Sequence, residues 1–255
     1  MSSPTTIALL ALVALVAGVI DAIGGGGGLL TVPALLAAGL PPHLALGTNK
    51  GCSTFGTAAA TATFARAGKL GRARTLSSFG GAALGAIFGA QMQLAFSPAA
   101  LRPVVLVLLV IVAVVLVIPR RSRVPAANDR TRTTRGAWAP FVIALVLGAY
   151  DGFFGPGTGT FLIVAHASLL GAALSDATAD AKAANLGSNV ASLALFSIRG
   201  TVLWSIALPM ALLGIVGNVI GARLAVKSGD RLVRWVVVAV SLALVAKLTA
   251  DFVRG

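Results

Sequence analysis

The sequence has few charged residues, a single cysteine and no glutamate. Charged residues make up 11% of the 255 positions, which is about half the share found in a typical soluble domain. Hydrophobic residues make up 57%, and the mean hydropathy is +0.95. Because Cys52 is alone, neither an intrachain disulfide nor a cysteine-based metal cluster can form. The composition excludes an ordinary soluble domain and favours an all-α, polytopic integral membrane protein.

The net charge of +13 raises the possibility of nucleic-acid binding. The basic residues, however, cluster between apolar segments, at 66–74, 120–135 and 223–234. No aromatic residues alternate with them, as a surface for stacking bases requires. Clusters at the ends of apolar segments are typical of cytoplasmic loops. We therefore expect a lipid bilayer as the partner, and no nucleic acid.

Part of the sequence occurs twice. Residues between 25 and 104 recur 132 positions later, for example in the pairs Gly25/Gly157, Lys50/Lys182, Gly85/Gly217 and Arg102/Arg234. Asp21 recurs as Asp151, 130 positions later. An apolar chain with a duplicated internal charge indicates a secondary transporter. We divide it into an N-terminal transmembrane repeat (1–119), a basic cytoplasmic linker (120–136) and a C-terminal transmembrane repeat (137–255).

The hydrophobic pattern predicts five helical segments in each half. We expect them at 5–22, 29–40, 44–65, 75–97, 101–118, 138–154, 160–173, 177–198, 202–223 and 231–250. The second segment of each half is short and follows a glycine-rich break, at 24–28 or 155–159. Irregular backbone at membrane depth is tolerated where protein or a water-filled cavity satisfies it. Broken helices at matching places in two halves point to a binding site.

The topology depends on whether the short segments cross the membrane. If they cross, each half has five crossings and the repeats are inverted; if they re-enter, each half has four and the repeats are parallel. The distribution of basic residues favours the inverted arrangement, with the N-terminus outside the cell. The apolar run 5–19 has no preceding basic residue, unlike a signal peptide, so we expect it to be retained as the first span.

Each half has a lysine inside an apolar segment. Lys50 is followed by Ser53 and Thr57, and Lys182 by Asn185 and Asn189 at the same spacing. The spacings i, i+3 and i+7 place each set on one helical face. A lysine in hydrocarbon normally faces a bundle interior or a wet cavity. Snorkelling to the interface is the alternative, but it does not explain why the polar residues recur in register.

Lysines, amides and hydroxyls around a helix break suit an anion, because helix N-termini offer unpaired N–H groups and partial positive charge. The predicted substrate site comprises Lys50, Lys182, Thr48, Asn49, Ser53, Asn185, Ser188, Asn189, Gly26, Gly27, Gly157 and Gly159. We expect no metal, no cofactor and no catalytic residues. The chain shows no phosphate loop, no histidine and cysteine metal spacing, and no serine-based triad.

Three further residues are candidates for proton coupling. Asp21 and Asp151 end the first segment of each half, where each could neutralise a lysine while the site is empty. The alternative is that each caps the following short helix. His166 lies in the short segment of the second half and is either a coupling residue or an ordinary hydrogen-bonded core histidine.

Several sequence blocks carry a resemblance to a known family: GGGGGLLTVP at 24–33, GTNK at 47–50, YDGFFGPGTGTF at 150–161, ATADAKAANLGSN at 177–189 and GARLA at 221–225. At these blocks the chain resembles the TauE/SafE family of sulfite exporters, over nearly its whole length. The resemblance implies an inner-membrane transporter that exports sulfite or organosulfonates, driven by the proton gradient. Asp180 departs from the family pattern, where histidine or asparagine is common; an acid beside Lys182 would weaken anion binding or take part in coupling.

Other functions stay open. A cation or metal exporter would use Asp21 and Asp151 as ligands, and a non-transporting membrane scaffold would use the lysines structurally. A membrane enzyme is the least favoured, because no nucleophile and base stand together in the sequence. A homodimer is compatible with a bundle of this size. The sequence gives no role for Cys52.

Overall fold

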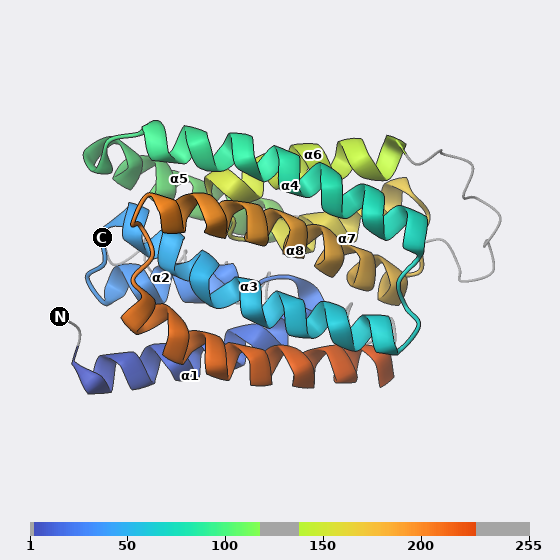
Figure 1. Cartoon of the computed structure of the whole chain (residues 1–255), viewed down its shortest axis with the longest axis horizontal. Helices are drawn as coiled ribbons and strands as arrows, with labels where there is room; N and C mark the ends of the chain where they lie inside the picture. The colour runs from blue at the N-terminus through green and yellow to red at the C-terminus, as the bar shows by residue number, and fades with distance from the viewer. Residues whose placement is uncertain (1–2, 118–137, 228–255) are drawn as a thin grey trace.

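The computed structural model describes residues 3–117 and 138–227, and these ranges are all-helical (Figure 1). The helices are α1 (Pro4–Gly24), α2 (Gly28–Ala37), α3 (Pro42–Arg66), α4 (Arg72–Ala95), α5 (Pro98–Val117), α6 (Trp138–Phe153), α7 (Thr158–Leu169), α8 (Leu174–Ile198) and a further helix at Trp204–Lys227. The predicted all-α class is confirmed, and the predicted segments match these helices to within a few residues. The predicted linker at 120–136 and the predicted last segment at 231–250 lie outside the described residues.

Glycine sets the two helix breaks. The α1 helix ends at Gly25, whose φ of 78° lies in the left-handed region and whose N–H donates to Asp21 O at 2.9 Å. The α7 helix begins after Gly157, which has a φ of 86°. Glycine adopts such angles without steric cost, whereas residues with a Cβ rarely do. The two matching glycines therefore interrupt the chain at matching places.

The two breaks lie against each other. The Thr160 hydroxyl donates to Gly24 O at 2.7 Å, and the Thr160 N–H donates to Gly25 O at 3.2 Å. A Cβ atom added at Gly25 would lie 2.2 Å from the carbonyl carbon of Gly159. Backbone groups freed at one break are thus satisfied in part by the other, as buried irregular backbone requires.

The helices form two bundles that mix the two halves of the sequence. In the first bundle, the Trp204–Lys227 helix packs with α1 and α3. In the second bundle, α4 packs with α6 and α8. Each bundle therefore takes one long helix from the other half of the chain, and Figure 1 shows the two groups lying one above the other.

Glycine rows allow close helix contacts. A Cβ at Gly85 of α4 would lie 2.0 Å from Leu145 O of α6. A Cβ at Gly217 would lie 2.1 Å from Leu15 O of α1. These contacts match in both partners, because Gly85/Gly217 and Leu15/Leu145 recur at the offsets of the duplication. Small residues let backbones approach in this way in membrane helices.

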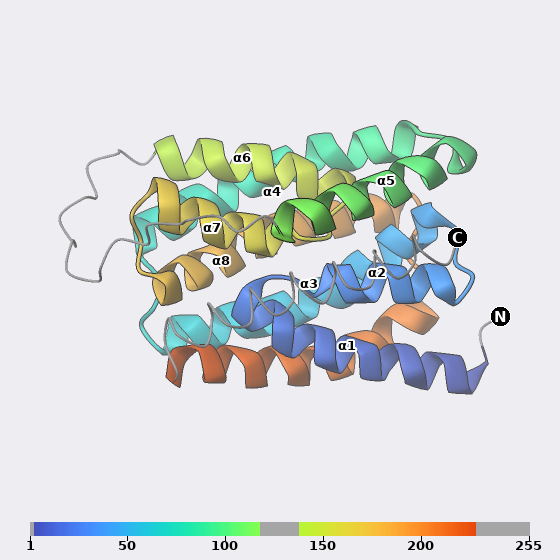
Figure 2. The same ribbon diagram turned by 180° about the vertical axis from the view of Figure 1, so that it is seen from behind.

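Corresponding helices run in opposite directions. In Figures 1 and 2, α1 and α6 point opposite ways, and so do α3 and α8. The short α2 returns toward the side on which α1 begins, and α7 returns toward the side on which α6 begins (Figure 2). Inverted repeats require these directions; the duplication itself stays a prediction from the sequence.

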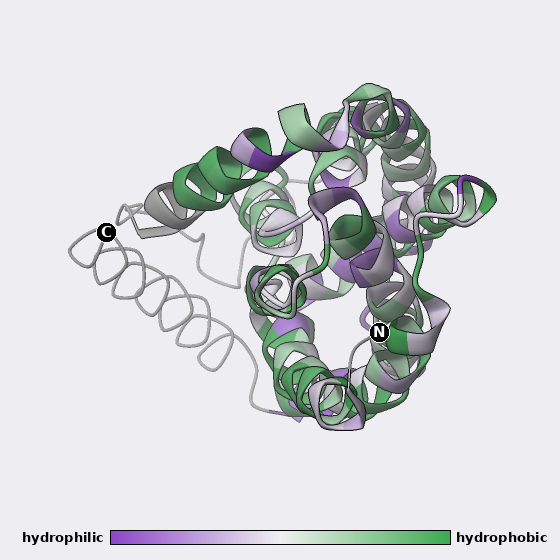
Figure 3. Ribbon diagram, turned by 90° about the vertical axis from the view of Figure 1, so that its left-hand side faces the viewer, coloured by the Kyte–Doolittle hydropathy of each residue, from purple (hydrophilic) through white to green (hydrophobic). Residues whose placement is uncertain are grey.

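The surface is apolar and the interior contains polar residues. Large hydrophobic side chains such as Leu12, Phe88 and Leu212 are more than half exposed, whereas Lys50 and Lys182 are buried. Viewed along the helices, apolar residues colour much of the outer ribbon, and hydrophilic stretches lie among the helices (Figure 3). A surface of this kind suits lipid. Two of the described helices, α1 and Trp204–Lys227, are long and apolar enough to cross a membrane.

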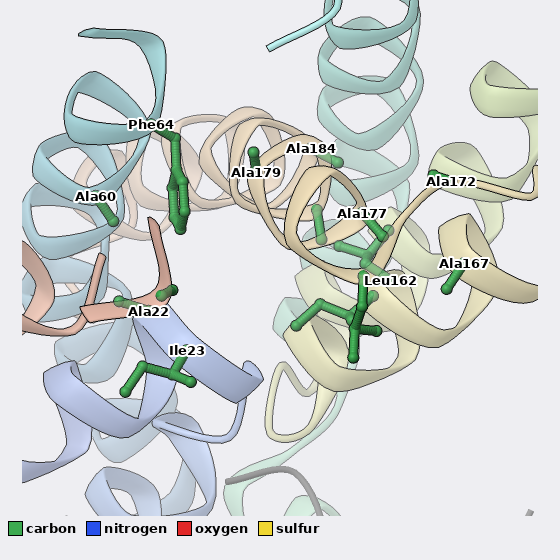
Figure 4. Packing of buried hydrophobic residues seen from close by; sticks show 14 of the residues in the cluster. Ala22, Ile23, Ala60, Phe64, Leu162, Ala167, Ala172, Ala177, Ala179 and Ala184 are labelled. Atoms are coloured by element: carbon green, nitrogen blue, oxygen red, sulfur yellow. The ribbon is translucent and has the colours of Figure 1, made fainter. Parts of the chain in front are cut away.

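Alanine dominates the largest buried cluster. Figure 4 shows Phe64 of α3 near Ala60 and Ala22, and Leu162 of α7 near Ala177. Side chains this small leave little space between helices and bring the short broken helices close to α3 and α8. This packing holds the two breaks in the middle of the molecule, where the polar residues gather.

Candidate functional site

A cavity of about 50 Å³ lies where the two breaks meet α1, α3, α8 and the Trp204–Lys227 helix. Ten of the predicted site residues line it: Asp21, Gly27, Asn49, Lys50, Ser53, Asp151, Gly157, Gly159, Asn185 and Asn189. Five others do not contribute to its wall, namely Gly26, Thr48, His166, Lys182 and Ser188. The structure thus brings ten of the predicted residues together around one cavity; their role in binding stays a prediction.

Lys50 joins the two bundles. Its ammonium lies 2.7 Å from Asp151 Oδ2 of α6 and donates to Asn189 Oδ1 of α8 at 2.8 Å. The Lys50 and Asp151 side chains are 4% and 2% exposed, so the pair is shielded from solvent. The ammonium does not snorkel to an interface. Within the described residues it has these two acceptors, which leaves its third N–H for another acceptor.

Lys182 makes the corresponding contact from the second bundle to the first. Its ammonium donates to Asp21 Oδ2 of α1 at 2.6 Å, and it is fully buried. The other oxygen of Asp21 accepts the N–H of Gly27 at 3.2 Å, at the start of α2. Asp21 therefore does both things considered from the sequence: it pairs with a lysine, and it caps the short helix.

The four charges cancel across the bundle interface. Each lysine meets a carboxylate from the opposite bundle, so the site has no net charge in this state. Buried ion pairs persist only when further hydrogen bonds satisfy the charged atoms. Asp151 receives such bonds from the Ser188 hydroxyl and from Asn185 Nδ2, the latter at 3.4 Å.

Amides and hydroxyls extend this network. Asn189 Nδ2 donates to Thr57 Oγ1 and to Asn185 Oδ1, each at 3.3 Å. On the other side of the cavity, Thr31 Oγ1 donates to Asn49 Oδ1 at 2.5 Å. These side chains can donate or accept hydrogen bonds, so they suit an oxyanion that has several acceptor oxygens.

Two predicted site residues have structural contacts instead. Thr48 Oγ1 accepts the N–H of Leu203 at 3.1 Å, just before the Trp204–Lys227 helix. His166 is fully buried between Ser78 Oγ at 3.2 Å and Leu162 O at 2.8 Å. These contacts are those of a hydrogen-bonded core histidine, which was the alternative to a coupling residue.

Asp180 does not act on Lys182 directly. Its carboxylate contacts the guanidinium of Arg74 and accepts the Thr75 hydroxyl at 3.1 Å, at the start of α4. It also accepts the N–H of Gly71. The side chain points to the neighbouring helix, and its effect on anion binding or coupling stays a prediction from the sequence.

The sequence reasoning missed Asn218. This residue lies in an apolar helix, lines the cavity and donates to Gly214 O at 3.0 Å. The predicted site residues were mostly polar residues that occur in both halves. Asn218 is not among them, because the matching position in the first half is Ala86. A lone amide in an apolar span was the available signal. Cys52, left unexplained by the sequence, also lines the cavity.

Comparison of the sequence with known proteins identifies a family of membrane transporters. Residues 10–248 match the family described as "Sulfite exporter TauE/SafE". The chain belongs to the TauE/SafE family. It is 37% identical to "Probable membrane transporter protein ORF9" of Sinorhizobium sp, over 96% of this chain and 93% of that one. The resemblance stated from the sequence blocks is confirmed, and the chain is a membrane transporter of this family.

Other TauE/SafE relatives agree. The chain is 36% identical to "Probable membrane transporter protein YfcA" of Escherichia coli (strain K12), over 98% of this chain and 92% of that one. It is also 36% identical to a "Probable membrane transporter protein" of Haemophilus influenzae, over 96% and 95% of the two chains. No solved structure matches the chain.

Proposed function

We propose that this TauE/SafE transporter exports small anions, sulfite or organosulfonates, across the cell (inner) membrane with proton coupling. The observation that carries the proposal is the position of Lys50. Its ammonium is buried on the wall of a central cavity with amides around it, and among the described residues one of its N–H groups has no acceptor. A buried ammonium in a membrane protein marks a binding site or pathway by default.

The balance of charge supports proton coupling. Two lysines and two aspartates compensate each other in this arrangement. An anion entering alone would leave one negative charge in excess in a medium that solvates charge poorly. A proton that neutralises one carboxylate removes this excess and frees an ammonium for the anion. Anion and proton then occupy the site together and cross in the same direction, so the outward anion gradient drives export and a proton gradient assists it only when it also points outward.

The packing supports a motion of the two bundles against each other. Both lysine–aspartate pairs connect the first bundle to the second, and the two breaks touch at the same interface. Exchange of a carboxylate for a substrate anion therefore changes contacts between bundles. Alternating access around a site at such an interface is the usual behaviour of transporters with broken helices.

The geometry supports a cation exporter less well. Each carboxylate that a cation would need already contacts an ammonium at 2.7 Å or less. Within residues 3–117 and 138–227, no three or more His, Cys, Asp or Glu side chains gather as a metal-binding group. A cation would have to displace a lysine that has no other charged partner in the described part of the chain.

Flux in proteoliposomes tests the proposal. Radiolabelled sulfite is loaded, and its release is followed for the wild type, Lys50→Ala, Lys182→Ala and the control Lys69→Ala. Lys69 lies in an exposed pair 3.6 Å from Asp176 and should not matter. We expect protein-dependent release that is lost in both buried-lysine variants. Release by the wild type no faster than by protein-free vesicles would contradict sulfite transport and favour a scaffold role.

A further inference from the structure

Asp21 and Asp151 occupy matching positions in the two halves, but different residues surround them. The residues around them also match at an offset of 132: Ser53 with Asn185, Gly56 with Ser188, and Ala86 with Asn218. Each of these pairs has changed its chemistry between the two halves. The two lysine–aspartate pairs are therefore equivalent in position and unequal in hydrogen bonding.

Asp151 is held as an anion by three side-chain donors. Lys50 lies 2.7 Å away, Ser188 donates its hydroxyl, and Asn185 donates its amide at 3.4 Å. The side chain is 2% exposed. Donors of this kind stabilise the negative charge of a carboxylate.

Asp21 has fewer donors and more access. In the described part of the chain, its side chain accepts from Lys182 and from the N–H of Gly27. It is 16% exposed and lines the cavity. The residues matching the extra donors of Asp151 do not reach it: Gly56 has no side chain, and Ser53 Oγ makes no hydrogen bond to described residues.

Asn218 keeps a hydroxyl out of the place that Ser188 occupies in the other half. A Cβ added at Gly56 would lie 2.4 Å from Asn218 Nδ2, and one added at Gly18 would lie 2.8 Å from it. The amide fills the space between these two glycines. In the second half, Ala86 stands at the matching position and has only a methyl side chain.

We propose that Asp21 takes up the coupling proton, whereas Asp151 stays ionised and anchors Lys50; this inference rests on the anion transport proposed above. A proton from cavity water binds a carboxylate oxygen of Asp21. Lys182, which does not line the cavity itself, then loses its charged partner, and its positive charge balances the anion held at the third N–H of Lys50. Release of the anion and the proton restores the Lys182–Asp21 contact.

No other charged group competes with Lys182 at Asp21 in the described structure. The α8 helix contributes Lys182, and α3 contributes Lys50, already paired, and the Cys52 thiol on the cavity wall. From α7, His166 is bonded to Ser78 and Leu162. The Trp204–Lys227 helix contributes the uncharged Asn218 at this level.

The first test compares Asp21→Asn with Asp151→Asn in sulfite-loaded proteoliposomes. Two rates are measured: exchange of labelled for unlabelled sulfite at equal pH, and net flux driven by a pH difference. Asp21→Asn imitates the protonated carboxylate, so the loaded protein still exchanges. Its net flux falls by about a hundredfold, because the empty protein must carry an unpaired Lys182 ammonium. Asp151→Asn loses both rates, since Lys50 loses its anchor.

The second test recreates the surroundings of Asp151 around Asp21. The double variant Gly56→Ser with Asn218→Ala copies Ser188 and Ala86 into the first half. The new hydroxyl favours ionised Asp21, so the pH of half-maximal net flux moves down by roughly one unit. The matched control, Ser188→Gly, leaves this pH in place even where it lowers the total flux.

The outcomes separate the two claims. A wild type that does not carry sulfite contradicts the proposed function. A wild type that carries it, with Asp21→Asn still driven by the pH difference, overturns the assignment of Asp21. If both aspartate variants lose exchange, the double variant decides: a shift confined to it supports Asp21, and an unmoved pH profile, or an equal shift in Ser188→Gly, overturns the assignment.

Discussion

Asn189 Nδ2 donates to Thr57 Oγ1 at 3.3 Å, and these two residues occupy matching positions in the two halves of the sequence. In the predicted inverted repeat, matching positions touch only close to the axis that relates the two halves. Asn189 also accepts from Lys50, so the charged network lies at this centre. Transporters built from repeats usually bind substrate at the repeat interface.

The buried pair of Lys50 and Asp151 should be coupled in stability. We expect Lys50→Ala to destabilise the protein by about 3–5 kcal/mol, because it leaves a buried carboxylate unpaired. The double variant Lys50→Ala with Asp151→Ala should be more stable than Lys50→Ala. Thermal unfolding in detergent, followed by tryptophan fluorescence, measures both. Lys69→Ala is the control and should cost about 0–1 kcal/mol; additive effects of the two buried substitutions would contradict the coupling.

The glycine contacts should be sensitive to a single methyl group. Gly85→Ala places a Cβ 2.0 Å from Leu145 O, so α4 and α6 must separate. We expect a loss of about 1–3 kcal/mol or more. Gly80 is the matched control on the same helix, since a Cβ there meets nothing within 4 Å. Gly80→Ala should be neutral or stabilising by up to about 1 kcal/mol. Equal unfolding temperatures for the two variants would refute the close packing.

Cys52 should report on the cavity. It is the single cysteine of the chain and lines the cavity wall. Because Cys52 is buried, N-ethylmaleimide can reach it only in a conformation that opens the cavity. Pretreatment during turnover, followed by removal of the reagent with excess thiol, should then block sulfite flux in the wild type because the adduct fills a small space. Cys52→Ser should be insensitive to the same treatment. Full flux through protein whose modification is verified by mass spectrometry would place the cavity off the pathway.

His166 should not carry the coupling proton. Its two ring nitrogens are engaged by Ser78 and Leu162, and it does not line the cavity. We expect His166→Gln to keep the wild-type dependence of sulfite flux on pH, with any loss confined to thermal stability. A changed pH profile at unchanged protein folding would return His166 to the coupling machinery.

The helices could be predicted because hydrophobic runs and glycine breaks act locally. The helix breaks at Gly25 and Gly157 could be predicted because glycine readily adopts the left-handed backbone that each break has. The position of α4 could not be predicted: its packing against α6 and α8 depends on side chains far away in sequence. Mixing of the two halves within each bundle is a property of the packed molecule, not of any local pattern.

The candidate site shows the same division. Duplication identified Lys50, Lys182, Asp21 and Asp151 as a group, but periodicity could not reveal which carboxylate meets which lysine. Each pair joins residues from different halves, over separations that no local pattern encodes. Asn218 was missed for the opposite reason, because it has no counterpart. Comparing the two halves finds polar residues that occur in both, so it cannot find a polar residue, such as Asn218, that occurs in one half alone.

The central claim is that the compensated cavity around Lys50 binds a small anion. Equilibrium binding of radiolabelled sulfite to the purified protein in detergent tests it most directly, with Lys50→Ala and the control Lys69→Ala measured alongside. We expect saturable binding to the wild type and to Lys69→Ala, and an affinity about a hundredfold weaker in Lys50→Ala, since a buried charged contact is lost. Equal binding to Lys50→Ala, by protein that is folded, would contradict the account.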